Sequence, residues 1–257
     1  MSDIRLKTVD EIELMRAAGR IVAEVLDGLE TMMKPGVRLA DLDRFAEEII
    51  RGHGATPSFK GYPNAHDPDS PFPASICSSM NDVIVHGIPN GQILEEGDIL
   101  GVDCGAILDG WHGDSARTYR VGQCGPEASA LLRTTSEALD KGIAALEAGK
   151  PLGRVGHAIQ QHAEANGYAV VREFVGHGVG RNLHEAPKVA NFGSADSGPI
   201  VEVGLTIAIE PMVNVGTIHT KADPDGWTIR TADGSLSAHY EHTVAVTEAG
   251  PEILTLA

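Results

Sequence analysis

The stretch Asp98-Ile99-Leu100-Gly101-Val102-Asp103 is a short apolar run that ends in an acid, and the same pattern returns in Leu205-Thr206-Ile207-Ala208-Ile209-Glu210. Apolar runs of this length that contain β-branched residues are typical of buried strands. An ionised carboxylate at the end of a buried strand is costly unless another group compensates its charge. The two runs therefore predict core strands that each deliver a carboxylate in need of a partner.

Two predicted helices precede the first run. Thr8 and Glu11 form a capping-box pattern, after which apolar residues recur at helical spacing until the break at Lys34-Pro35-Gly36. A shorter helix should follow and end near Gly52. The first half of the chain is therefore expected to be a helix pair followed by strands.

The second half repeats this order. A helix is expected from about Glu127, then a break at Gly149-Lys150-Pro151, then another helix that ends at Asn166-Gly167. Like residues recur between the halves at a steady offset of 115 to 117 positions, as in the pairs Arg16 and Arg133, Lys34 and Lys150, Gly52 and Gly167, and Phe59 and Phe174. Because the offset is steady, an internal repeat is favoured over chance.

Two such halves, neither able to cover its own sheet, should stack into one unit. We expect an α+β fold in which a curved antiparallel β-sheet with pseudo-twofold symmetry is backed by helices. Residues 1–257 would form a single domain, with repeat halves at about 9–121 and 126–250. A site should then lie where the halves meet, which is a common location for pockets. Residues 61–73 are crowded with proline and other turn-forming residues, which predicts a loop.

The charge balance excludes some classes of partner. The 257-residue chain has 36 acidic and 20 basic side chains, a formal net charge of -16. Such a field repels phosphate backbones and anionic membrane surfaces. Specific nucleic-acid binding and membrane binding are therefore disfavoured, whereas a cationic group such as a free amino terminus would be attracted.

The cysteines and the apolar runs bear on the compartment. Cys77, Cys104 and Cys124 are odd in number and have no CxxC spacing, which favours neither a disulfide framework nor a structural zinc site. The sequence shows neither a signal-type apolar segment nor an apolar run long enough to span a bilayer. We therefore expect a cytoplasmic protein.

Four carboxylates are candidates for one site. Asp114 follows Asp103 across the turn signal Asp109-Gly110, so a hairpin would bring the two together. Glu210 ends the second apolar run, and Glu241 lies in a stretch with strand-like alternation. Each acid alone could be an ordinary structural residue, but four of them at one interface would repel strongly. Two divalent metal ions would neutralise them, because one carboxylate can bridge both ions and oxygen ligands suit hard or borderline metals.

Three histidines are candidates for completing such a site. His177 and His184 lie in a glycine-rich segment, where one imidazole could bind metal and the other could act on substrate. His86 follows a short apolar run, and its position alone carries little information. The glycines could also form a phosphate cradle, but neither a strand-to-helix GxGxxG fingerprint nor a P-loop lysine accompanies them. A nucleotide site is therefore disfavoured.

Together these residues resemble the methionine aminopeptidases, specifically the short type I form. The resemblance covers about residue 5 to the end and rests on motifs in family order, namely His86-Gly87-Ile88-Pro89, Asp103 with Gly110-Trp111-His112-Gly113-Asp114, Gly176-His177-Gly178-Val179-Gly180, His184-Glu185, Ile209-Glu210-Pro211-Met212 and Tyr240-Glu241-His242-Thr243. It implies the pita-bread fold of that family and metal-dependent hydrolysis that removes the initiator methionine from peptides and nascent proteins.

The resemblance also implies a set of metal ligands. Asp114 and Glu241 would bridge two divalent ions, Asp103 would bind the second ion, and His177 and Glu210 would complete the site of the first. Co, Mn, Fe and Zn all accept such ligands, so the sequence does not choose among them.

Catalytic and substrate-binding residues follow from the same resemblance. A water that bridges the metals would be the nucleophile, with Glu210 as its general base. His86 and His184 would contact the scissile carbonyl and the adjacent amide. The methionine side chain would enter a pocket formed by Tyr62, Phe72, Cys77, Leu183 and Trp227.

Two features depart from the family pattern. Leu183 stands where bacterial relatives often have an aromatic ring, and the loop at 64–71 is longer than in the minimal form.

The resemblance further implies a monomer that acts on nascent chains and associates transiently with the ribosome.

Two other functions compete with this one. Related pita-bread peptidases that act next to proline share much of the metal site but usually carry an additional amino-terminal domain, for which 257 residues leave no room. Metal-free relatives that only bind partners lose metal ligands, whereas all five ligand positions are present here.

Overall fold

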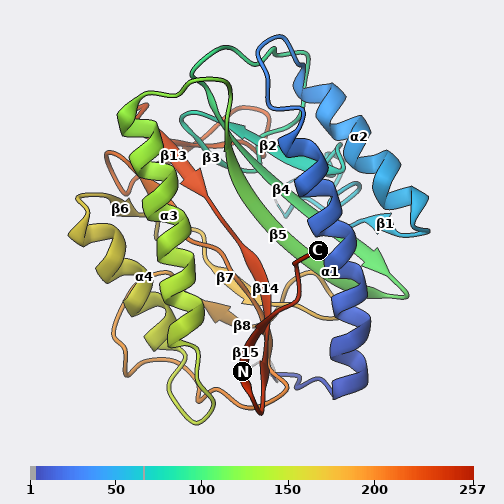
Figure 1. The fold of residues 1–257 in the computed structure, drawn as a ribbon, viewed down its shortest axis with the longest axis vertical. Coiled ribbons are helices and arrows are strands. Elements are labelled where there is room, and N and C mark those ends of the chain that lie inside the picture. Colours follow the sequence, from blue (N-terminus) through green and yellow to red (C-terminus); the bar gives the residue numbers. More distant parts are fainter. Residues whose placement is uncertain (1–3, 66) are drawn as a thin grey trace.

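The computed structural model describes residues 4–65 and 67–257. Within these residues four α-helices form, and they lie in the regions that the sequence predicts (Figure 1). They are α1 (Val9–Glu30), α2 (Leu39–Gly52), α3 (Pro126–Ala145) and α4 (Gly153–Ala165). No helix in the described part of the chain is both long enough and apolar enough to cross a bilayer.

Local hydrogen bonds set both ends of α1. The Thr8 side chain accepts from the Glu11 N–H and the Glu11 side chain accepts from the Thr8 N–H, which completes the capping box. At the other end, Thr31 donates its backbone N–H and its hydroxyl to the Gly28 carbonyl. The helix therefore ends at Glu30, a few residues before the break predicted at Lys34.

The strands fall into two groups along the chain, each after a helix pair. The first group is β1 (Thr56–Pro57), β2 (Ile76–Met80), β3 (Val83–Val85), β4 (Ile99–Leu108) and β5 (Trp111–Arg120). The second group is β6 (Ala169–Val170), β7 (Gly176–Gly178), β8 (Glu185–Val189), β9 (Thr206–Ile209), β10 (Met212–Asn214), β11 (Thr220–Ala222), β12 (Ile229–Thr231), β13 (Ser237–His239), β14 (His242–Thr247) and β15 (Gly250–Ile253).

Among the described residues, hydrogen bonding divides the expected curved sheet into four antiparallel sheets. The strand orders are β1-β4-β2 with β5 paired to β4, β15-β14-β9-β7-β8, β13-β10-β6, and β11-β12-β3. From β5, Ala116 exchanges backbone hydrogen bonds with Glu241, and the Thr118 hydroxyl bridges to the backbone of His239 in β13. These contacts join the two halves at β5 and the segment between β13 and β14.

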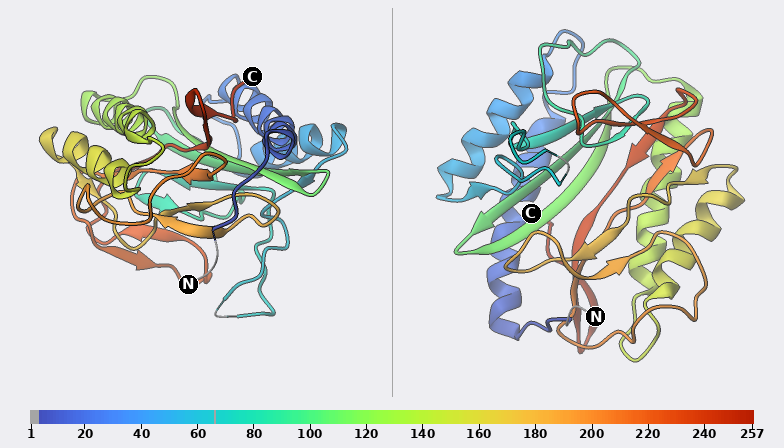
Figure 2. Two further views of the ribbon diagram at one scale, coloured as in Figure 1. Left: turned by 90° about the horizontal axis from the view of Figure 1, so that it is seen from below. Right: turned by 180° about the vertical axis from the view of Figure 1, so that it is seen from behind.

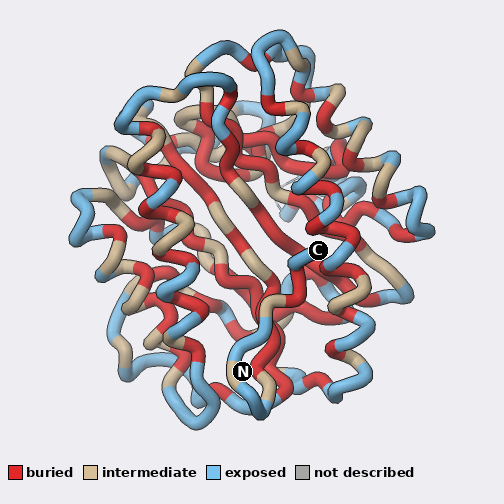
Figure 3. Tube along the Cα trace, viewed as in Figure 1, coloured by how far each residue is buried: buried red, intermediate tan, exposed pale blue. Residues whose placement is uncertain are grey.

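The helices cover one face of these sheets (Figures 1 and 2). α1 and α2 pack over the first half, with Leu26, Leu29 and Leu42 buried against β4. α3 and α4 pack over the second half around Ile159 and Val244. Burying each such side chain contributes about 1.5–3 kcal/mol. Figure 3 shows that the central strands are buried along most of their length, so their polar residues lie inside the protein. The α+β class with an antiparallel sheet backed by helices is confirmed.

Candidate active site

The β4–β5 hairpin positions the first two carboxylates. Its turn, Asp109-Gly110, has positive φ angles of 51° and 77°, as a two-residue type I′ turn requires. The resulting register places Ala116 opposite Asp103, so Asp114 lies diagonally across from Asp103 on the same face of the sheet. The predicted hairpin therefore does bring the two acids together.

The second half delivers the remaining residues from three strand ends. His177 lies in the short strand β7, Glu210 directly follows β9, and Glu241 lies between β13 and β14. Because β9 pairs with both β7 and β14, these ends meet at one point.

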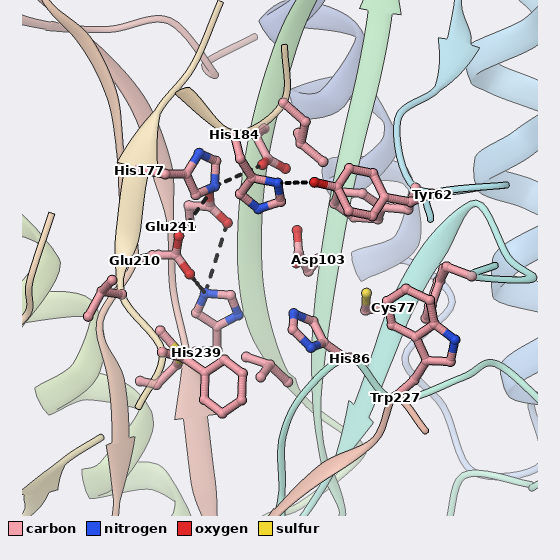
Figure 4. Close-up of a pocket in the computed structure, with 18 residues that line it drawn as sticks. Tyr62, Cys77, His86, Asp103, His177, His184, Glu210, Trp227, His239 and Glu241 are labelled. Carbon is pink, nitrogen blue, oxygen red and sulfur yellow. Dashed lines mark hydrogen bonds and ion pairs between the residues drawn. The ribbon is translucent and has the colours of Figure 1, made fainter. Parts of the chain in front are cut away.

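Short distances link the side chains of this site (Figure 4). His177 Nε2 lies 3.5 Å from Glu210 Oε1 and 3.7 Å from Asp114 Oδ2. The ligand atoms of Asp114, His177 and Glu241 all lie within 4.8 Å of one another, and all three residues are buried. Such a set of buried oxygen and nitrogen atoms matches what a divalent cation binds.

Several oxygen atoms at this site lack a partner. Asp103 Oδ1, Asp114 Oδ1 and Glu241 Oε1 are buried and have no hydrogen bond within the described residues. Buried polar atoms are nearly always satisfied, and an unsatisfied carboxylate oxygen is expensive. These three atoms therefore fit a site that a cation completes.

The environment of the site raises the pKa of each of its carboxyl groups. Burial raises the pKa of Asp103 to about 7. Burial, together with the charges of the neighbouring acids, raises the pKa values of Asp114, Glu210 and Glu241 well above the ordinary range. The protein alone thus resists holding four negative charges here, and positive charge must be supplied for all four groups to ionise at neutral pH.

The nearby imidazoles are shifted in the opposite direction. Burial, with His184 close by, lowers the pKa of His177 to about 3. Burial, with His86 close by, lowers the pKa of His239 to about 3, and the pKa of His86 itself falls to about 4. These histidines are neutral at physiological pH, and a neutral imidazole keeps the lone pair that a metal requires.

All twelve residues selected from the sequence line one cavity, whose volume is about 180 Å³. They are Tyr62, Phe72, Cys77, His86, Asp103, Asp114, His177, Leu183, His184, Glu210, Trp227 and Glu241. Sequence reasoning missed six further lining residues, namely Phe59, Val85, Phe174, Val175, Met212 and His239.

His239 is the most informative of the missed residues. Its Nε2 lies 3.8 Å from Glu210 Oε2 and 3.9 Å from Glu241 Oε2 (Figure 4). A signal was present, because residues two apart on a strand share a face and His239 precedes Glu241 by two positions.

The two candidate catalytic histidines are held differently. The Tyr62 hydroxyl lies 2.6 Å from His184 Nδ1, and the His184 ring packs 4.2 Å from the ring of His177. Because a tyrosine hydroxyl is an efficient donor, it favours the tautomer of His184 that carries its proton on Nε2. His86 has a φ of 60°, in the left-handed region that non-glycine residues seldom adopt, and such residues cluster at functional sites.

Aromatic and aliphatic side chains form the opposite wall of the cavity. Phe72 and Trp227 meet edge to face with ring centroids 5.1 Å apart. Cys77 and Leu183 are buried in the same apolar cluster. This wall offers an unbranched apolar or thioether side chain a surface without charge.

Comparison with known proteins shows that this chain is similar to one family of metallopeptidases and to individual proteins of that family. The model of metallopeptidase family M24 matches residues 13–248. A methionine aminopeptidase of Clostridium acetobutylicum is 50% identical over 254 residues, which cover 98% of this chain and 99% of the relative. The crystal structure of a methionine aminopeptidase from Thermotoga maritima superposes with a TM-score of 0.95 at 42% identity, covering 99% of this chain and 100% of that one.

A more distant likeness concerns the fold alone. A prolidase of Pyrococcus furiosus has a TM-score of 0.76 at 21% identity, covering 98% of this chain and 65% of that one. The pita-bread fold expected from the motifs is therefore confirmed by both close and distant structures.

Proposed function

We propose that this chain, which belongs to the methionine aminopeptidases of metallopeptidase family M24, hydrolyses the peptide bond after an amino-terminal methionine. The observation that carries the proposal is one cavity in which four carboxylates, two of them fully buried, and a neutral histidine face an apolar wall. A metal centre beside a pocket for one apolar side chain suits removal of a single terminal residue.

The metal centre would hold two divalent ions, drawn from Co, Mn, Fe and Zn. We assign Asp103, Asp114, His177, Glu210 and Glu241 as the ligands, because their unpartnered oxygens and neutral imidazole fit cations. When bound, such ions polarise a carbonyl and make water a stronger nucleophile at neutral pH.

Glu210 would transfer the proton that the attacking water loses during hydrolysis. Its carboxylate faces the cavity within 3.5 Å of His177 Nε2, and its pKa is raised by burial and by the charge of Asp103. A carboxylate with a raised pKa accepts a proton from attacking water and can return it to the leaving amine.

His184 and His86 would act on the reacting amide. With Nδ1 facing the Tyr62 hydroxyl, His184 can present an Nε2 proton to the oxygen on which negative charge develops. His86 lies across the cavity from His184 and would contact the adjacent amide (Figure 4).

The methionine side chain would lie against Tyr62, Phe72, Cys77, Leu183 and Trp227. The thioether is polarizable and unbranched, so it suits an aromatic and sulfur-containing wall. The substrate would be the free amino end of a peptide or nascent chain, whose positive charge complements the acidic protein.

At the level of the whole chain, residues 1–257 would act as one catalytic unit with repeat halves at about 9–121 and 126–250. The helix pairs and strand groups recur in that order, which supports the division. We further propose a cytoplasmic monomer that meets nascent chains near the ribosome without binding a specific nucleic acid.

A peptide panel tests this function directly. Protein loaded with Mn or Co should release methionine from a Met-Ala-Ser peptide, and chelation should stop the release. Glu210→Gln should cost several kcal/mol of transition-state stabilisation, as removal of a proton-transfer group does. Glu248→Gln, which changes an exposed acid outside the site, should behave like wild type.

The same panel separates the alternatives. Cleavage of Xaa-Pro peptides with no release of methionine would instead assign the chain to the proline-directed peptidases. Absence of hydrolysis with every metal, together with normal folding, would favour a partner-binding protein and end the proposal.

A further inference from the structure

Lys7 and Glu185 form a buried ion pair that the proposed reaction does not use. Lys7 Nζ donates to Glu185 Oε2 at 2.7 Å, although 178 residues separate the two in sequence. The Lys7 side chain is 1% exposed and the Glu185 side chain 10% exposed. Lysine is almost never buried this fully without a charged partner, so the pair holds the two segments together.

Lys7 is itself fixed in place by its neighbours. Its backbone N–H donates to the Gly204 carbonyl at 2.7 Å, and its side chain also donates to the Arg5 carbonyl at 3.0 Å. The next residue, Thr8, caps α1. The Lys7 ammonium group therefore reaches Glu185 from a segment that is anchored by the Gly204 backbone and by the start of α1.

Glu185 organises the turn that carries His184. Its Oε1 accepts the Asn182 N–H at 3.1 Å, and its backbone pairs with Gly178 of β7. The fit around the carboxylate is close, because a Cβ placed on Gly180 would lie 2.6 Å from Glu185 Oε1. Leu183 and His184, which line the cavity, lie within this turn.

We propose that Lys7 is a positioning residue, which through Glu185 holds the turn at 181–184 so that His184 faces the reacting bond. The inference rests on the proposed function, because it assigns a support to one of its histidines. Removing one member of a buried pair leaves an uncompensated charge, whereas neutralising both members together is far less costly. Lys7 should therefore matter only while Glu185 is ionised.

The ionisation of Glu185 gives the inference a pH signature. Burial alone would raise the pKa of Glu185, but hydrogen bonds from Lys7 and from the backbone of the turn outweigh burial and lower it. The other titratable groups around this turn are Arg5, Arg181, His112, His177 and His184. Burial lowers the pKa of His112 to about 4, that of His177 to about 3 and that of His184, so these histidines are already neutral at pH 7 and do not change charge as the pH rises further.

The experiment compares Lys7→Met, Lys7→Arg, Glu185→Gln and the Lys7→Met/Glu185→Gln double variant, with the exposed Lys34→Met as control. Without Lys7, the unpaired Glu185 should stay protonated at low pH and ionise as the pH rises, which displaces the turn. We expect kcat of Lys7→Met on Met-Ala-Ser to fall about tenfold to a hundredfold at alkaline pH, with KM less affected, as misplacement of a reacting group does. The double variant should recover most of this loss and lose its dependence on pH. Lys7→Arg should stay close to wild type.

Hydrogen exchange provides a readout that does not depend on activity. The Asn182 amide, which Glu185 protects, should exchange faster in Lys7→Met at alkaline pH and recover in the double variant. A Lys7→Met protein with the wild-type pH profile and wild-type exchange would overturn the inference. So would a double variant that melts normally yet recovers neither kcat nor protection.

Two further outcomes are informative. If Lys7→Met does not fold, the double variant provides the test. A double variant that folds with near-normal protection of the Asn182 amide supports the ion pair as the cause of the ordered turn. A double variant that folds without this protection refutes it. If wild type releases no methionine, the proposed function fails, whereas the exchange of Asn182 still decides whether Lys7 holds the turn.

Discussion

Tyr62 contributes to the site through two separate parts of its side chain. Its ring lies with the apolar wall, and its hydroxyl lies 2.6 Å from His184 Nδ1. Tyr62→Phe removes only the hydroxyl, so we expect kcat to fall about two- to tenfold, the worth of one hydrogen bond, while KM changes little.

Steady-state kinetics on a Met-Ala-Ser peptide would measure this effect, with Tyr168→Phe as the matched control. The Tyr168 hydroxyl has no hydrogen bond within the described chain, so its loss should be silent. If KM rises in Tyr62→Phe at constant kcat, the hydroxyl serves substrate binding and not the orientation of His184.

Individual residues differ in how much the sequence alone reveals about them. Asp103 and Glu210 were predictable because a carboxylate that ends an apolar run violates the usual cost of burial. His239 had only a weak signal, its position two residues before Glu241, because a histidine on a strand breaks no such rule and its role depends on Glu210, which reaches it only through folding. The sequence therefore identifies groups that are anomalous in themselves and misses those that matter through their neighbours.

At the scale of elements, β5 packs unusually closely on α1. A Cβ on Gly113 would lie 2.6 Å from the backbone nitrogen of Gly19, where no flexible side chain can yield. Gly113→Ala should therefore force the strand and helix apart and cost about 1–3 kcal/mol or more. Because Asp114 is the next residue, metal affinity should weaken as well.

Urea denaturation and metal titration would measure both effects. Gly52→Ala is the matched control, since a Cβ there meets nothing within 4 Å at the end of α2. An unchanged free energy of unfolding for Gly113→Ala would show that the helix and strand can separate without cost.

Elements with local signals were predictable, and contacts between loops were not. The capping box of α1 and the type I′ turn of the β4–β5 hairpin depend on neighbouring residues, so the sequence contains their whole cause. The loop at 61–73 was expected only to be irregular. In the structure the Trp227 indole donates to the Ser70 carbonyl and the Asn64 side chain donates to the Gly226 carbonyl, which joins the loop to the β11–β12 turn. Residue 66 of this loop lies outside the described residues.

The arrangement of the whole molecule was predictable in kind but not in detail. A repeat at a steady offset predicts two similar halves, and the four carboxylates that line one cavity come from both parts of the chain. Neither the division into several sheets nor the register shift between His177 and Gly178 within the β7–β8 pair is encoded by a local pattern in the sequence.

For the molecule as a whole, the carboxylates and histidines of the site make opposite contributions to the dependence of stability on pH. The buried histidines have lower pKa values in the folded protein than in the unfolded chain, where the value is about 6.5. They stabilise the fold fully above about pH 6.5, and this stabilisation is lost as the pH falls. The carboxyl groups of the site have higher pKa values in the folded protein than in the unfolded chain, where the value is about 4. They stabilise the fold fully below about pH 4, and this stabilisation is lost as the pH rises through the pKa of the folded state, which is about 7 for Asp103. Between about pH 4 and 6.5 the two effects oppose each other.

Of these two sets of groups, only the carboxyl groups continue to titrate above about pH 6.5, so their combined effect has one sign there. Metal-free protein should lose stability as the pH rises from neutrality, because the native state holds protons that the unfolded state has released. Added Mn or Co binds the ionised carboxylates, so its stabilising effect should grow over the same range. Thermal melting with and without a chelator, at several pH values above neutrality, measures both trends. A metal-free melting temperature that rises with pH in this range would mean that the buried acids are already neutralised by other groups of the protein, and the case for cations at this site would fail with it.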